Sequence, residues 1–213
     1  MFTKALLPDT LRAIQLVASL PTVKRAYLAG GTALALQLGH RLSQDLDFFT
    51  QEEFDENILA TSLLKIKAFK EDRRDWRTIL GYISNTKFSI FYYPYKLIEK
   101  PLAFEGIRIL RKKDIATMKL DAIGNRDAKR DFIDLFFLAK EFSLNQVFDF
   151  YEQKYGNLEE KMYHLIKGVS YFEDAETEKQ PEMFIATEWD KVKEFFQQEA
   201  IRLAKEKLNI PSL

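Results

Sequence analysis

The sequence contains no cysteine, and this absence excludes several classes of protein. Without thiols, the chain cannot carry thiol catalysis, thiolate metal sites, iron–sulfur clusters or a disulfide scaffold. Only two histidines, His40 and His164, remain as nitrogen ligands, so a zinc enzyme is not expected. Because 46% of the residues are hydrophobic, the chain is expected to be folded rather than disordered.

Other features that are missing restrict the compartment and the partners. No apolar run approaches the roughly 20 residues that span a bilayer. The first residues also lack the uninterrupted apolar stretch of a signal peptide. We therefore expect a cytoplasmic chain without a membrane partner. Thirty-two basic residues balance thirty-two acidic ones, so the overall charge does not indicate a polyanionic partner, and any such argument depends on local patches.

The hydrophobic pattern changes character near residue 111. Before that point short apolar stretches alternate with helical periodicity, and after it the periodicity is helical throughout. We find no internal repeat and no low-complexity tract. The expected strands cover residues 25–29, 45–50, 77–83, 87–93 and 107–110. The expected helices cover residues 8–20, 32–38, 53–67, 112–124, 127–141, 144–154, 158–171 and 184–207, with a loop over residues 173–182. The pattern predicts an α+β fold, with a small mixed sheet flanked by helices followed by a helical region.

The most informative segment is AGGTALALQLGHRLSQDLDFF, residues 29–49. Gly30 and Gly31 stand between an expected strand and an expected helix, where backbone can come close to a phosphate at a helix N-terminus. Thr32 adds a hydroxyl in the same turn. The alternative is that the two glycines only permit a tight turn.

Two carboxylates follow at strand spacing. Asp45 and Asp47 are two residues apart, so both point to one side of a strand and can converge on Mg²⁺ or Mn²⁺. The alternative is a solvated strand end, with both carboxylates facing open solvent away from the glycines. Arg41 and Ser43, just upstream, are suited to bind phosphate oxygens. An ordinary surface arginine is the competing interpretation.

The pattern GG-T-x-L followed by GHR-x-S-x-D-x-D-FF resembles the AbiEii/AbiGii toxin family of the polymerase-β-type nucleotidyltransferase superfamily. FYYPY, residues 91–95, and DIATMKLDAIGNRDAKRDFIDLFFL, residues 114–138, are similar to the same family. The resemblance implies that Gly30, Gly31 and Thr32 bind nucleotide phosphates and that Asp45 and Asp47 hold the catalytic metal. It also implies that Lys119 and an acid from Asp131 or Asp134 complete the site. The expected domains are a nucleotidyltransferase-like core, residues 1–110, and a helical region that completes the active site, residues 111–213.

The later residues also make physical sense on their own. Lys119 and Arg126 share one helical face and could reach triphosphate oxygens. Asp127, Asp131 and Asp134 form an acidic stripe on the next helix. The alternative is a surface helix whose charges make weak exposed pairs. The sequence does not choose between Asp131 and Asp134 as the catalytic acid.

One departure concerns the metal count. Residues 76–98 contain no aspartate or glutamate, although many enzymes of the wider superfamily carry a third metal-binding carboxylate on a neighbouring strand. Ser89 lies where that acid is expected. Three explanations therefore stay open: the site uses one metal ion, Asp131 or Asp134 supplies the missing carboxylate, or the chain has lost catalysis and only binds nucleotide.

These features predict a Mg²⁺-dependent nucleotidyltransferase that moves a nucleoside monophosphate from a nucleoside triphosphate to an acceptor hydroxyl. The resemblance makes RNA, and tRNA in particular, a reasonable acceptor, and it implies a toxin of a toxin–antitoxin or abortive-infection system with a cognate antitoxin. Clustered cations and aromatic residues between residues 65 and 113 could hold an RNA end. The alternatives are a catalytically degenerate nucleotide- or RNA-binding module, and a host-interaction protein that docks through aromatic residues of the helical half.

Overall fold

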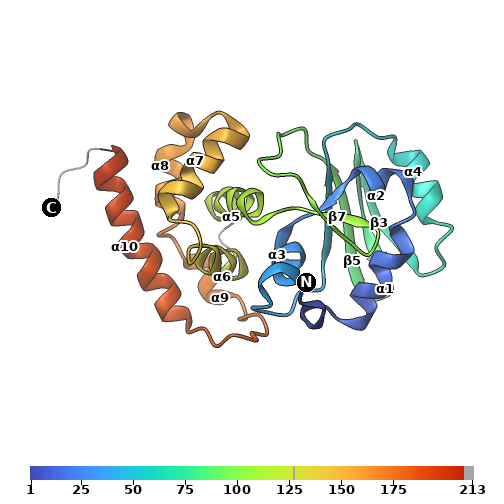
Figure 1. The fold of residues 1–213 in the computed structure, drawn as a ribbon, viewed down its shortest axis with the longest axis horizontal. Coiled ribbons are helices and arrows are strands. Elements are labelled where there is room, and N and C mark those ends of the chain that lie inside the picture. Colours follow the sequence, from blue (N-terminus) through green and yellow to red (C-terminus); the bar gives the residue numbers. More distant parts are fainter. Residues whose placement is uncertain (127, 209–213) are drawn as a thin grey trace. The chain divides into compact units, whose positions relative to one another are not determined.

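The computed structural model describes residues 1–126 and 128–208 (Figure 1). Asp127, part of the predicted acidic stripe, lies outside the described residues. The chain divides into two compact units, Met1–Arg111 and Lys112–Leu213, which are considered separately. In the part of the chain that the structure describes, no helix is long and apolar enough to cross a membrane.

The first unit is built on one mixed sheet. Its helical elements are η1 (Thr3–Ala5), α1 (Pro8–Val17), α2 (Pro21–Arg25), α3 (Gly30–Leu38) and α4 (Glu56–Leu63). Its strands are β1 (Tyr27–Leu28), β2 (Leu46–Thr50), β3 (Phe69–Asp75), β4 (Thr78–Ile83), β5 (Thr86–Tyr92), β6 (Leu102–Phe104) and β7 (Ile107–Ile109). Helices α1, α2, α3 and α4 pack against strands of this sheet, so the predicted α+β class with a mixed sheet flanked by helices is confirmed.

Strand β2 lies inside this sheet. The seven strands found among the described residues run in the order β3-β4-β5-β2-β1-β7-β6. β2 pairs parallel with β5 and antiparallel with β1, and Leu46 and Phe48 are buried in the core while Asp47 and Phe49 face the other way. Both edges of β2 are hydrogen-bonded, so side chains on it are held by a rigid backbone.

The sequence pattern missed several elements. Strand β3 has the sequence FKEDRRD, in which only Phe69 is buried, because it is an edge strand that pairs with β4 alone and carries charges that discourage further pairing. Strand β6 has only three residues. Helix α2 begins at Pro21, where the pattern predicted the end of a helix.

The predicted loop over residues 173–182 is wrong in its first half, which forms helix α9 (Glu173–Thr177). Acidic residues fill the first turn of α9, where they interact favourably with the helix dipole. The buried side chain of Ala175 anchors this short helix, which packs against α6.

The second unit is helical. Its other helices are α5 (Lys112–Arg126), α6 (Lys129–Leu138), α7 (Leu144–Tyr155), α8 (Leu158–Gly168) and α10 (Trp189–Leu208). Helix α5 contacts α6, α7 and α8, and α10 packs against α6 and α8. A buried ion pair joins α5 to α7, since Lys154 Nζ lies 2.8 Å from Asp114 Oδ1. Each helix predicted after residue 111 overlaps an observed helix.

Candidate functional site

The first turn of α3, which holds Gly30 and Gly31 and is called the glycine turn below, lies directly against the carboxylate of Asp47. Gly30 begins α3 with a φ of +64°, a left-handed conformation that costs an L-residue energy. The Ala29 N–H donates a 2.9 Å hydrogen bond to the Asp47 carbonyl, which ties the turn to β2. A Cβ on Gly30 would lie 3.2 Å from Asp47 Oδ2. The carboxylate of Asp47 therefore faces the glycine turn rather than pointing away from it.

The side chains of Arg41 and Ser43 lie close to Gly31. A Cβ on Gly31 would overlap with Arg41 Nη2 and would lie 3.3 Å from Ser43 Oγ. Arg41 is buried, and its Nη1 donates a 3.0 Å hydrogen bond to the Leu42 carbonyl. Thus the absence of a side chain at Gly31 leaves the room in which the Arg41 guanidinium sits.

Two hydroxyl groups connect the first turn of α3 to the segment that precedes β2. The hydroxyl oxygens of Thr32 and Ser43 are 2.9 Å apart, and the Thr32 hydroxyl donates to the main-chain carbonyl of Asp45. This contact fixes the segment that leads into β2. The predicted phosphate-binding residues of the first unit are thereby gathered around the N-terminus of α3, which is a favourable place for an anion.

Ser89 on β5 is the direct partner of Asp47 across the sheet. The parallel register pairs these two residues, and Ser89 Oγ donates a 2.6 Å hydrogen bond to Asp47 Oδ1. Ser89 is buried, so its hydroxyl fixes the orientation of the carboxylate without adding negative charge. Sequence reasoning identified this position only as a missing acid. Its role as the partner of Asp47 depends on the register of β2 and β5.

Asp45 and Asp47 fit a hard divalent cation. Asp45 directly precedes β2 and is partly buried, as is Asp47. In residues 1–126 and 128–208, no group of three or more histidine or acidic side chains is placed to hold a metal ion. Mg²⁺ commonly uses only one or two protein carboxylates and takes its other ligands from water and substrate phosphates. The Asp47 carboxylate beside Gly30, with Asp45 two residues earlier in the chain, supplies oxygen donors of the kind that this mode of binding uses.

The second unit contains a compact buried charge cluster. Lys119 Nζ on α5 lies 2.6 Å from Asp131 Oδ1 and 2.6 Å from Asp134 Oδ2, both on α6. Arg126 Nε lies 2.8 Å from Asp131 Oδ2. The side chains of Asp131 and Asp134 are fully buried, whereas 56% of the Arg126 side chain is exposed. These acids do not make the weak surface pairs of the alternative interpretation.

The electrostatics of this cluster favour an ionised Asp131. Burial by itself raises the pKa of Asp131, but the charges of Lys119 and Arg126 and their hydrogen bonds outweigh burial. The pKa of Asp131 therefore lies below its ordinary value. Since Lys119 contacts both acids at the same distance, the geometry does not separate Asp131 from Asp134.

Aromatic rings continue the face of the sheet on which Asp47 lies. Phe49 follows Asp47 by two residues, and its ring centroid is 5.4 Å from that of Phe91 and 5.2 Å from that of Tyr93. The rings of Tyr93 and Tyr95 are 4.7 Å apart. We call this row, Phe49, Phe91, Tyr93 and Tyr95, the aromatic strip. Its first three rings are half-buried and Tyr95 is 42% exposed, whereas neighbouring Phe88 belongs to the core.

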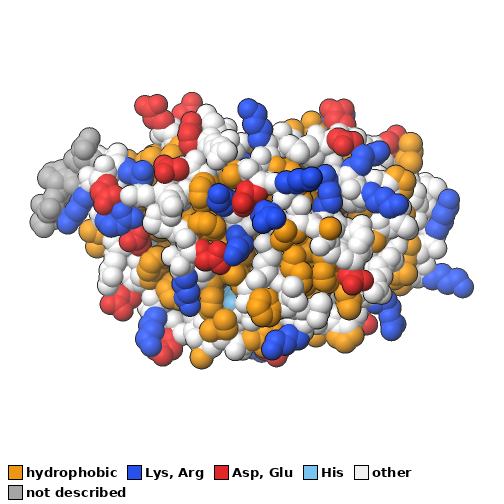
Figure 2. Space-filling model, viewed as in Figure 1, with side chains coloured by type: hydrophobic (Ala, Val, Ile, Leu, Met, Phe, Trp, Pro, Cys, Tyr) orange, Lys and Arg blue, Asp and Glu red, His pale blue; other side chains and the backbone are white. Residues whose placement is uncertain are grey.

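Many of the clustered cations are paired with acids. Arg73 contacts Asp75, and Arg74 forms two hydrogen bonds with Glu71. Arg77 pairs with Glu53 and lies over the ring of Trp76 at 4.5 Å. Figure 2 shows charged side chains of both signs scattered over the face in view. This region is therefore not a uniformly positive surface.

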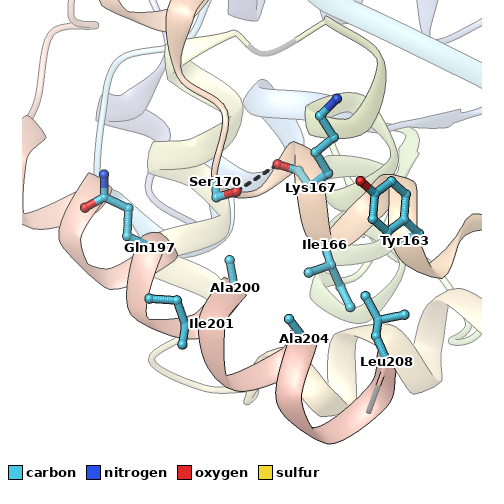
Figure 3. A pocket seen from close by; sticks show the side chains of 9 residues that line it. All are labelled: Tyr163, Ile166, Lys167, Ser170, Gln197, Ala200, Ile201, Ala204 and Leu208. Atoms are coloured by element: carbon cyan, nitrogen blue, oxygen red, sulfur yellow. Dashed lines mark hydrogen bonds between the residues drawn. The ribbon is translucent and has the colours of Figure 1, made fainter. Parts of the chain in front are cut away.

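A groove of about 480 Å³ lies between α8 and α10 (Figure 3). Apolar residues such as Ile166, Ala200 and Leu208 line much of it, together with Tyr163 and Lys167. None of the predicted site residues lines this groove.

Known proteins resemble this chain in sequence and in fold. The family model described as nucleotidyl transferase AbiEii toxin, type IV TA system, matches residues 16–102. An uncharacterized protein of Aquifex aeolicus (strain VF5), aq_aa25, is 37% identical over 190 residues, which cover 86% of this chain and 90% of that protein.

Two solved structures share the fold. JHP933 from Helicobacter pylori matches with a TM-score of 0.53 and 20% identity over 94% of this chain and 91% of its own. MenT4, the nucleotidyltransferase toxin Rv2826c from Mycobacterium tuberculosis H37Rv, matches with a TM-score of 0.53 and 16% identity over 92% of this chain and 84% of its own. These likenesses confirm the predicted nucleotidyltransferase fold.

Proposed function

The chain belongs to the AbiEii nucleotidyltransferase toxin family, and from that premise we propose that it transfers a nucleoside monophosphate from a nucleoside triphosphate to an RNA hydroxyl, with tRNA the first candidate acceptor. That it is a nucleotidyltransferase follows from its family. The observation that carries the finer proposal is the contact of Asp47 with the glycine turn, where a Cβ on Gly30 would lie 3.2 Å from Asp47 Oδ2. A carboxylate and an anion-binding turn are thus adjacent.

Binding of the triphosphate would use the N-terminal turn of α3. Backbone N–H groups of Gly30 and Gly31 offer donors and the positive end of the helix dipole. The guanidinium of Arg41, held over Gly31, adds a fixed positive charge, and the paired hydroxyls of Thr32 and Ser43 hold the neighbouring backbone in place. These groups would hold the phosphates that leave as pyrophosphate.

Asp45 and Asp47 would hold the divalent cation, Mg²⁺ or Mn²⁺. When bound, this ion neutralises phosphate charge and polarises the reacting phosphoryl group. The hydrogen bond from Ser89 keeps one oxygen of Asp47 in place, so the other oxygen faces the glycine turn. With no third acid at Ser89, we propose that a single cation bound by Asp45 and Asp47 suffices.

The reaction we propose is an in-line displacement. The acceptor oxygen forms a bond to the α-phosphorus while the bond from this phosphorus to the oxygen bridging to the β-phosphate breaks. The electron pair of that bond leaves with pyrophosphate. Asp45 or Asp47 accepts the acceptor proton and releases it to water.

The buried cluster of the second unit contributes charge in this proposal. The Arg126 side chain is 56% exposed, and a guanidinium is suited to bind triphosphate oxygens. Lys119 balances the buried carboxylates of Asp131 and Asp134, one of which we propose completes the site. The domain roles we propose are a nucleotide-binding core, residues 1–110, and a helical region that completes the active site, residues 111–213.

In the cell, we propose that the enzyme works in the cytoplasm, where triphosphates and RNA are present, as the toxin of a toxin–antitoxin system in phage defence. A cognate antitoxin would restrain it. A second candidate function, a degenerate nucleotide- or RNA-binding module, is favoured by one observation, the serine at position 89 opposite Asp47.

The deciding experiment incubates the purified protein with each α-³²P-labelled nucleoside triphosphate, Mg²⁺ and total bacterial RNA, beside the Asp47→Ala variant. We expect label on RNA with wild type and a loss of about 100-fold or more with the variant, because several kcal/mol of charge stabilisation disappear. Circular dichroism of Asp47→Ala should match wild type. Full transfer by the variant would refute the metal assignment, and nucleotide binding without any transfer would support the binding module.

A further inference from the structure

The aromatic strip begins beside Asp47 and runs away from the glycine turn. In the antiparallel pairing of β1 and β2, Tyr27 lies opposite Phe49 and Leu28 opposite Phe48. Gly30 therefore lies near the start of β2, on one side of Asp47, and Phe49 lies on the other side, about 7 Å further along the strand. The carboxylate thus separates a phosphate-binding turn from a row of rings.

The positions of the glycine turn and the aromatic strip on opposite sides of Asp47 indicate where each substrate binds. In an in-line displacement the attacking oxygen approaches opposite the leaving group. If pyrophosphate leaves on the side of the glycine turn, the acceptor approaches from the side of the aromatic strip. Resting on the proposed function, we propose that the aromatic strip binds the acceptor and that this acceptor is the single-stranded end of an RNA.

The chemistry of the strip favours nucleobases. Its rings form a chain of contacts from Phe91 through Phe49 and Tyr93 to Tyr95, with centroid separations of 5.4, 5.2 and 4.7 Å between successive rings. Such a row offers stacking surface for successive unpaired bases, which stack on aromatic side chains without regard to sequence. In duplex RNA the bases are already stacked and paired, so a duplex end without an overhang cannot use the strip in this way.

Two lysines that follow the strip in the chain also favour a single-stranded RNA as the acceptor. Lys96 and Lys100 follow Tyr95 in the chain and are exposed. Cations beside stacking rings are the usual means by which proteins hold the backbone of single-stranded RNA. The Gln51 side chain donates a 2.9 Å hydrogen bond to the Tyr95 carbonyl, which anchors the backbone under the most exposed ring.

The first test measures binding without catalysis. A fluorescein-labelled short single-stranded RNA is titrated with the full-length protein by fluorescence anisotropy, with no nucleotide present. Tyr95→Ala and Tyr95→Leu should weaken binding at least about fivefold, because each removes one stacking surface. Tyr95→Phe, which keeps the ring, should bind like wild type.

Tyr163→Ala is the matched control, because Tyr163 is also an exposed tyrosine, 65% exposed, but lies on α8 outside the strip. It should bind RNA like wild type. Equal binding by Tyr95→Ala and wild type would overturn the proposal, as would equal affinity for a blunt RNA duplex. The urea midpoint of each variant should match that of wild type.

The second test separates this proposal from the proposed function. With radiolabelled transfer as the readout, Tyr95→Ala should raise the KM for single-stranded RNA and leave the KM for the nucleoside triphosphate unchanged. If wild type transfers label and Tyr95→Ala shows no change in the KM for RNA, the strip proposal fails and the function stands. If wild type transfers nothing but Tyr95→Ala weakens RNA binding, the function fails and RNA binding by the strip stands.

Discussion

Ser89 Oγ donates a 2.6 Å hydrogen bond to Asp47 Oδ1 from the neighbouring parallel strand. The contact explains how this chain can orient its central carboxylate without a third acid. A buried hydroxyl donor holds one carboxylate oxygen and leaves the other toward the glycine turn. Groups that orient a metal ligand are worth about 10–100-fold in metal affinity or activity.

Ser89→Ala removes this donor while leaving both carboxylates in place. We expect transfer activity to fall about 10- to 100-fold, with a weaker apparent affinity for Mg²⁺ and a nearly unchanged melting temperature. A titration of activity against Mg²⁺ concentration measures both quantities. Wild-type Mg²⁺ dependence in this variant would remove Ser89 from the site.

Ser89→Asp tests the metal in a different way. It places a carboxylate at the buried position next to the partly buried Asp47, and like charges so close destabilise the fold when no cation is present. We expect Tm to fall without Mg²⁺ and Mg²⁺ to raise it more in the variant than in wild type. Differential scanning calorimetry with Mg²⁺ or with EDTA gives the comparison. The same Mg²⁺ effect on both proteins would argue against a cation at Asp47.

Gly31→Ala should displace the guanidinium of Arg41, because the new Cβ overlaps with Arg41 Nη2. The expected result is a KM for the nucleoside triphosphate raised about tenfold or more, since charge-assisted hydrogen bonds to phosphate are lost. Steady-state kinetics with varied nucleotide measures the change.

Gly156→Ala is the control for the Gly31 variant. Gly156 has a φ of +66°, and a Cβ added to it would meet no atom within 4 Å, so alanine there introduces backbone strain without a clash. We expect a loss of about 1–2 kcal/mol in the free energy of unfolding and an unchanged KM. If both variants raise KM equally, loss of stability rather than movement of Arg41 is the cause.

The sequence was most informative where local chemistry decides the structure. The spacing of Asp45 and Asp47 predicted a strand, which the structure contains as β2, whereas Gly30 and Gly31 form the first turn of α3 rather than a turn before it. Strand β3 was missed because charged residues on an edge strand show no apolar alternation. The contact of Lys119 with both acids of α6 was also missed, because it depends on how two helices pack rather than on spacing within one.

That packing changes what a substitution at Lys119 reports. Lys119→Ala leaves Asp131 and Asp134 buried without their shared cation, and breaking a buried pair costs about 3–5 kcal/mol. We therefore expect a large drop in the urea midpoint, so a loss of activity in this variant would not identify a substrate contact. A midpoint equal to wild type would contradict this account.

Arg126→Ala is the better probe of triphosphate binding. Because 56% of the Arg126 side chain is exposed and Asp131 keeps Lys119 as its buried partner, removal of Arg126 should cost much less stability than removal of Lys119. We expect a near-normal urea midpoint and a raised KM for the nucleoside triphosphate. An unchanged KM would exclude Arg126 from the nucleotide site.

The stability of the chain in acid should depend on Asp131. Burial by itself raises the pKa of this carboxyl, but Lys119 and Arg126 lower it further than burial raises it, so the folded pKa lies below the unfolded value of about 3.9. The folded protein thus binds this proton more weakly than the unfolded chain does. The stability from Asp131 is fully present above the unfolded pKa and is lost as the pH falls through the folded pKa.

Asp131→Asn isolates that contribution, because the amide has nearly the same shape and cannot titrate. At pH 7 the variant should be less stable by about 1–3 kcal/mol, since charged hydrogen bonds to Lys119 and Arg126 are weakened. As the pH falls below about 4, wild type should lose stability more steeply than the variant, so that the two curves of unfolding free energy converge. Urea denaturation at a series of pH values measures both curves. Parallel curves would show that Asp131 has the same pKa in the folded and unfolded chains and would contradict the role of the two cations.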